Sequence, residues 1–87
     1  MMTVITRKGP GPEKERDVFI TAEAGSASTR WKGEFWTPIT DRYEPGEEIF
    51  LALKDGRAGH GRVVRIELDT NIRTNCRIEF VGIGPLG

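Results

Sequence analysis

The chain has 87 residues, which is enough for one domain and too few for two. Its 13 Lys and Arg residues balance 13 Asp and Glu residues, so it lacks the basic surplus that is typical of dedicated nucleic-acid binders. Cys76 is the only cysteine, which excludes an intramolecular disulfide and a zinc site built from cysteines. No segment has the apolar length of a signal peptide or a membrane span. We therefore expect a cytoplasmic protein that does not insert into membranes.

The first 16 residues are predicted to form a flexible lead-in. Gly and Pro alternate at residues 9–12 and block both a helix and strand pairing, which indicates a loop. The mixed charges of residues 13–17 favour a solvated approach to the first strand. Five strands follow, or six if residues 3–6 also form one.

The first expected strand covers residues 17–24 and places Val18, Ile20 and Ala22 on one face and Phe19, Thr21 and Glu23 on the other. Small polar residues then predict a turn at residues 25–28.

An aromatic segment comes next, at residues 29–37, with Gly33 in its middle. A regular strand would place Trp31 and Phe35 on one face. A β-bulge at Gly33 would also turn Trp36 inward. On this basis we predict that Trp36 is more buried than Trp31.

The next two strands are expected to form a hairpin. A turn at residues 44–46 precedes an alternating run at residues 48–54. Gly-rich residues 55–61 predict the connection to a second alternating run. The expected inward side chains are Ile49, Leu51, Leu53, Val64, Ile66 and Leu68. Residues 49–53 should pair with residues 64–68, because this pairing buries one common apolar face.

The last strand is expected to direct Cys76, Ile78 and Phe80 inward. A free Cys in such a pattern behaves as a small apolar residue, which favours a buried Cys76 over a reactive thiol. Residues 82–87 are expected to fray.

These elements predict an all-β fold, because no segment of about ten residues shows helical periodicity. We expect a small single-domain antiparallel β-barrel of five to six strands over residues 17–83, followed by a tail at residues 84–87. A barrel is favoured over a sandwich because closure removes exposed edges.

Neither His60 nor the glycines around it predict catalysis. A triad or a metal site needs convergent partners, and a single His supplies one group at most. We interpret His60 as an exposed residue of a loop or a strand start. The spacing of Gly56, Gly59 and Gly61 suggests a phosphate loop, but no Lys-Ser/Thr follows and the next residues read as a strand. We therefore predict a protein with no catalytic, cofactor or metal site.

Cations and aromatic rings alternate in Arg-Trp-Lys at residues 30–32. Proteins that bind single-stranded nucleic acids use this combination, whereas the competing interpretation is that the rings fill a thin core. Arginines of the later strands either extend the same surface or pair with neighbouring glutamates across the sheet. The candidate binding surface consists of Arg30, Trp31, Lys32, Arg57, Arg62 and Arg65.

The second half of the chain resembles the closing half of PilZ domains. The resemblance is carried by P-G-E-E-I-F-L-A-L, G-R-V-V-R-I and R-I-E-F-V-G-I, and it covers about residues 45–83. It implies a small barrel of PilZ-like or SH3-like size. PilZ domains that bind cyclic di-GMP carry R-x-x-x-R before the first strand and D/N-x-S-x-x-G in the early barrel. This chain has no D/N-x-S, and its string from Arg73 to Arg77 lies in the last strand.

The resemblance thus implies a protein-interaction or regulatory module that has lost cyclic di-GMP binding. A weaker similarity, through G-R-x-x-x-G-R-V-V-R-I, is to the β-barrel modules of translation factors. The alternative function is therefore a small barrel that binds nucleic acid or a nucleotide through residues 30–36.

Overall fold

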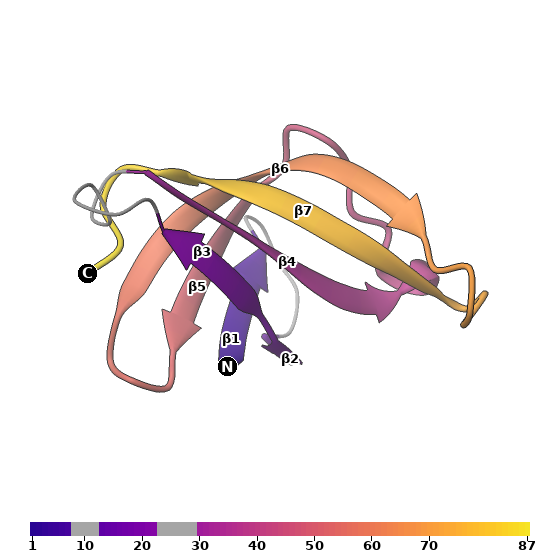
Figure 1. Cartoon of the computed structure of the whole chain (residues 1–87), viewed down its shortest axis with the longest axis horizontal. Helices are drawn as coiled ribbons and strands as arrows, with labels where there is room; N and C mark the ends of the chain where they lie inside the picture. Colours follow the sequence, from indigo (N-terminus) through magenta and orange to yellow (C-terminus); the bar gives the residue numbers. More distant parts are fainter. Residues whose placement is uncertain (8–12, 23–29) are drawn as a thin grey trace.

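The computed structural model describes residues 1–7, 13–22 and 30–87. The loop predicted at residues 9–12 and the turn predicted at residues 25–28 lie outside these residues. Within the described residues, seven strands form one antiparallel sheet in the order β2-β1-β5-β6-β7-β4-β3 (Figure 1). The strands are β1 (Met2–Arg7), β2 (Lys14–Asp17), β3 (Phe19–Ala22), β4 (Trp31–Pro38), β5 (Glu48–Leu53), β6 (Ala58–Leu68) and β7 (Asn75–Ile83), with a short 3-10 helix η1 (Ile39–Asp41) after β4.

The sheet nearly closes into a barrel because its two edge strands are successive parts of one run of chain. β2 pairs with β1, β3 pairs with β4, and only the buried Val18 separates β2 from β3. At this corner the amide of Val18 donates to the carbonyl of Met1 at 2.9 Å, and the Met1 amine donates back to the Val18 carbonyl at 3.0 Å. The predicted all-β barrel is confirmed, with seven strands instead of five to six.

The described part of the predicted lead-in is also sheet. β1 extends the alternative strand at residues 3–6, with Thr3 and Ile5 buried. The charged residues expected to approach the first strand form β2. This strand carries no apolar signal, because its partly buried positions are Lys14 and Arg16, and the Arg16 side chain reaches Thr37 and Asp41.

Two aromatic rings in the core lie over strand positions that have no side chain. A Cβ added at Gly82 would lie 2.2 Å from the Trp31 indole, and one at Gly59 would lie 2.9 Å from the same ring. A Cβ at Gly61 would lie 2.8 Å from the Phe80 ring. Gly59 and Gly61 are therefore inward positions of β6, and the prediction that they belong to a connection is wrong.

β5 and β6 form the predicted hairpin, but in a different register. The connection is short: the Leu53 amide donates to the Arg57 carbonyl at 2.8 Å, and Gly56 has a φ of 95°. β5 pairs with residues 58–62, so the predicted pairing with residues 64–68 is wrong. The error follows from treating the glycines of β6 as a loop.

A β-bulge at Val64 reverses the alternation of β6, because the pairing with β7 skips this residue. Val63 is buried before the bulge, and Ile66 is partly buried after it. Val64 is 49% exposed and Leu68 is 71% exposed. The predicted inward face of this strand is thus correct only at Ile66.

The inward faces of β5 and β7 are confirmed, since all of their predicted residues are buried: Ile49, Leu51, Leu53, Cys76, Ile78 and Phe80. The end of the chain does not fray as predicted. Leu86 is buried, and Gly87 exchanges backbone hydrogen bonds with Ala58 at 3.0 and 3.1 Å. The tail therefore covers one end of the barrel.

β4 is a regular strand with no bulge at Gly33, which stays in register with both neighbouring strands. Trp31 points into the barrel and is 4% exposed, whereas Trp36 points outward and is 37% exposed. The prediction that Trp36 is the more buried of the two is wrong, because an uninterrupted strand places positions of opposite parity on opposite faces.

Candidate functional site

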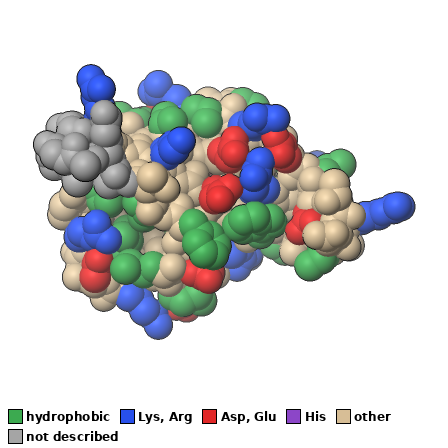
Figure 2. Space-filling model, viewed as in Figure 1, with side chains coloured by type: hydrophobic (Ala, Val, Ile, Leu, Met, Phe, Trp, Pro, Cys, Tyr) green, Lys and Arg blue, Asp and Glu red, His purple; other side chains and the backbone are tan. Residues whose placement is uncertain are grey.

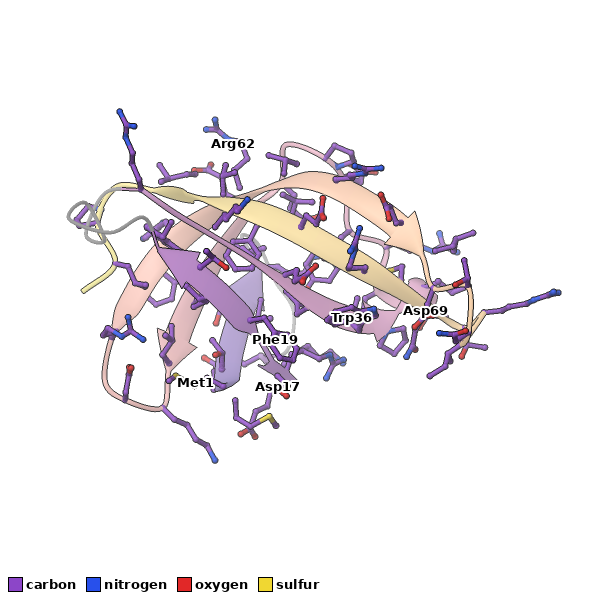
Figure 3. The ribbon with its side chains drawn as sticks, viewed as in Figure 1. Met1, Asp17, Phe19, Trp36, Arg62 and Asp69 are labelled. Carbon is purple, nitrogen blue, oxygen red and sulfur yellow. The ribbon has the colours of Figure 1, made fainter. Side chains whose placement is uncertain are left out.

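Exposed apolar side chains gather on the outer face of β3, β4, β7 and β6. The rings of Phe19 and Trp36 meet edge to face, with centroids 5.8 Å apart (Figure 3). Phe19 is 53% exposed, and Val64 and Val81 on the same face are 49% and 39% exposed. We call this surface the β4–β7 face.

Strand register arranges the β4–β7 face in rows that run across the sheet. Each row contains one residue of β4, one of β7 and one of β6. In that order the rows are Trp36, Arg77 and Glu67; then Glu34, Glu79 and Arg65; then Lys32, Val81 and Arg62.

The middle of the face holds a cluster of charges around Arg77. Its guanidinium lies 2.7 Å from a carboxylate oxygen of Glu67, 3.2 Å from one of Glu79 and 3.5 Å from one of Glu34. Arg65 also pairs with Glu67. Figure 2 shows acidic and basic side chains gathered together here, with hydrophobic side chains beside them. These ion pairs fix the outward side chains of three strands relative to one another.

An open depression of about 440 Å³ lies in the β4–β7 face. It extends from β3 to β6, so it has apolar side chains on opposite sides and charged ones between them. Its lining includes Phe19, Lys32, Glu34, Val64, Arg77 and Val81.

Three residues of the predicted binding surface lie on this face. Lys32 and Arg62 belong to one row and flank Val81. Arg65 lies in the next row, where it is paired with Glu67.

The other three predicted residues lie elsewhere. Trp31 is inside the barrel, where its indole N–H donates to the Gly84 carbonyl at 3.0 Å, so its ring cannot stack on a ligand. Arg57 is in the β5–β6 turn, 2.8 Å from Asp55. Arg30 is exposed immediately before β4.

The predicted binding surface lacks Phe19 and Trp36. The alternation of residues 17–24 already placed Phe19 opposite Val18 and Ile20. A large ring on the face opposite the apolar residues was the signal that could have identified Phe19 as a surface residue. For Trp36 the corresponding signal was the parity of β4, which the expected bulge obscured.

A second polar group closes one end of the barrel. The Arg7 guanidinium lies 4.2 Å from the centre of the Tyr43 ring and also contacts the Glu47 carboxylate and the Asp41 carbonyl. Burial raises the pKa of Tyr43 to about 12. The hydrogen bond to Glu47 raises the pKa of Arg7. Burial therefore favours a neutral Tyr43, and the Glu47 carboxylate favours a charged Arg7.

Arg16 bridges β2 to the end of β4 in the same region. Its Nε donates to the Thr37 hydroxyl at 3.2 Å, and its guanidinium lies 3.4 Å from the Asp41 carboxylate. Thr37 also donates a hydrogen bond to Asp41. The interactions of this end therefore link strands across the place where the barrel closes.

Cys76 is buried and His60 is exposed, as predicted. Cys76 is buried, its thiol donates to the Thr37 carbonyl at 3.6 Å, and burial raises its pKa. His60 is exposed on β6, with its ring edge to face on Phe50 at 4.8 Å between centroids. The rings contact each other, and this contact accounts for the orientation of His60.

In the described residues, no three His, Cys, Asp or Glu side chains are grouped in a way that could hold a metal ion. The described part of the chain also contains no helix with the length and hydrophobicity needed to cross a bilayer. Comparison with protein-family models, with curated proteins and with solved structures found no match.

Proposed function

We propose that this chain is a non-enzymatic module that binds another protein through the β4–β7 face. The observation that carries the proposal is the exposed aromatic pair of Phe19 and Trp36, with Val64 and Val81 on the same face. Exposed apolar groups that gather on one face beside polar groups are typical of interaction sites. Aromatic residues are also enriched in the cores of protein interfaces.

A protein partner is favoured over a nucleic acid. The nucleic-acid alternative relied on Trp31 as a stacking platform, and Trp31 is buried. The exposed Trp36 lies in a row with Arg77, which forms ion pairs with three carboxylates. A phosphate backbone that follows this ring would meet those carboxylates, which opposes binding.

The proposal includes a PilZ-like barrel that does not bind cyclic di-GMP, in the cytoplasm. The segment that resembles PilZ domains forms β5, β6 and β7, three consecutive antiparallel neighbours. In the R-x-x-x-R string, Arg77 forms ion pairs with Glu67 and Glu79, and Arg73 lies in the turn before β7. We expect no binding at about micromolar cyclic di-GMP, a free energy near −8 kcal/mol. Stoichiometric micromolar binding in calorimetry would refute this part of the proposal.

The interaction surface is testable with peptides selected on the wild-type domain from a random-peptide display library. The affinity of the selected peptides should fall by at least about tenfold in the double variant Phe19→Ala/Trp36→Ala, since interface aromatics carry a large share of binding energy. The matched control is Phe50→Ala/Ile72→Ala, which removes exposed apolar side chains that belong neither to the aromatic pair nor to the lining of the depression. A selection that yields no binders, or binders equally affected by both variants, rules the proposal out.

A further inference from the structure

Two cations of the β4–β7 face are exposed and have no ion pair or hydrogen bond to any other residue in the described part of the chain. They are Lys32 on β4 and Arg62 on β6. The other cations of the face, Arg65 and Arg77, are bound to glutamates. The charge of the face is therefore uneven: the cations at its centre are in ion pairs, and one end carries two cations that are not.

The register brings these two charges to the same place. Lys32 and Arg62 both lie opposite Val81, on the two sides of β7. Their Cα atoms are thus about 10 Å apart, twice the spacing of neighbouring strands. Long side chains from both positions can meet over Val81, and both can donate to one carboxylate. Glu48 lies opposite Arg62 on β5 and lowers the positive potential on the β5 side of Arg62. The favoured position for a ligand carboxylate is therefore above β7, between the two cations.

A depression with apolar side chains on two sides lies next to this pair of cations. Lys32 and Val81 line the 440 Å³ depression that also contacts Phe19 and Val64. In an extended peptide, side chains two residues apart point to the same side and are separated by about 7 Å. That is also the separation of successive rows on the β4–β7 face. An acidic side chain over Val81 would place an apolar one in the depression.

We propose that the β4–β7 face binds an extended segment of a partner protein that carries Asp or Glu two residues from a bulky apolar side chain. Lys32 and Arg62 hold the carboxylate, and the depression between Phe19 and Val64 holds the apolar group. This inference rests on the proposed function, and it specifies which protein segments the face selects.

The test uses the peptides selected on the wild-type domain and two charge-reversed variants. Lys32→Glu/Arg62→Glu reverses the two cations, and Lys54→Glu/Arg73→Glu reverses two exposed cations elsewhere with the same change in net charge. The selected peptides should be enriched in an acid and a bulky apolar residue at a spacing of two. Their affinity should fall about tenfold or more in the first variant and hold in the second. Added salt should weaken binding to the wild type, because the contacts are exposed.

The outcomes separate this inference from the proposed function. Peptides that need Phe19 and Trp36 but lack the acid, or that bind the Lys32→Glu/Arg62→Glu variant as well as the wild type, overturn the inference and leave the proposed function intact. If no peptide is selected, both are overturned. Binding of a thymidine oligonucleotide that depends on Lys32 and Arg62, in place of peptide binding, also overturns both.

Discussion

Two tryptophans five positions apart on β4 have opposite environments. Trp31 lies inside the barrel against Gly59 and Gly82, while Trp36 lies outside against Phe19. Residue type did not distinguish them. The difference arises from strand parity and from neighbouring strands, which leave room for one ring and offer the other an exposed partner. Trp31 therefore contributes mainly to stability, whereas Trp36 is available for binding.

The largest expected effect comes from truncating the inner ring. Trp31→Ala should lower the free energy of unfolding by about 3–5 kcal/mol, because it leaves a large cavity. For a domain of this length that is a large part of the total, which is about 4–13 kcal/mol. Trp36→Ala should cost about 1 kcal/mol, since its ring is partly solvated and loses one aromatic contact. Urea unfolding of both variants measures the difference, and equal losses would remove the distinction.

A methyl group at Gly82 tests whether the glycine makes room for the inner ring. Gly82→Ala should cost about 3 kcal/mol, the upper end for overpacking, because its Cβ would lie 2.2 Å from the indole. Trp31→Phe frees part of that space, so the double variant should lose less than the sum of the two single losses. If the loss of unfolding free energy in the double variant equals the sum of the two single losses, the two positions do not compete for space.

The interior also differs from the outer face in its response to pH. Tyr43 is buried with a pKa of about 12, above its ordinary value of 10. The folded state therefore keeps this proton at pH values where the unfolded state has lost it. The stabilisation is complete below about pH 10 and is lost as pH rises toward 12, a change of about 3 kcal/mol.

Tyr43→Phe is the control for that alkaline loss. It keeps the ring beneath Arg7 and against Phe35 but removes the ionising hydroxyl. The difference in unfolding free energy between wild type and variant should change by this amount between pH 9 and pH 12. If the two proteins follow parallel curves, Tyr43 does not titrate as the structure implies.

The sequence predicted the fold class and the strands whose alternation is uninterrupted. β7 alternates apolar and charged residues from Cys76 to Phe80, and β5 has its large aliphatic residues at every second position, so their inner faces were identified correctly. β6 was not, because Val63 and Val64 are adjacent and nothing in the sequence says which of them faces inward. The bulge that decides it depends on pairing with β7.

Glycine and charge were misleading elsewhere for a similar reason. Gly59 and Gly61 resemble a turn until Trp31 and Phe80 are placed above them. β2 has no apolar residue, because Arg16 reaches across to Thr37 and Asp41 at the end of the barrel. The candidate site was predicted only in part: Lys32, Arg62 and Arg65 lie on the β4–β7 face, but its rings are Phe19 and Trp36.

The most direct test of the distinction between the two tryptophans is one nitrogen–proton NMR titration of the wild-type domain with a selected peptide. The two indole N–H signals report the inner and outer rings separately. The Trp31 N–H, which is hydrogen-bonded to Gly84, should stay unchanged. The Trp36 signal and the amides of Lys32 and Val81 should shift as the peptide saturates the β4–β7 face. Shifts at Phe50 and His60 of the β5–β6 hairpin, with Trp36 unmoved, would contradict the account.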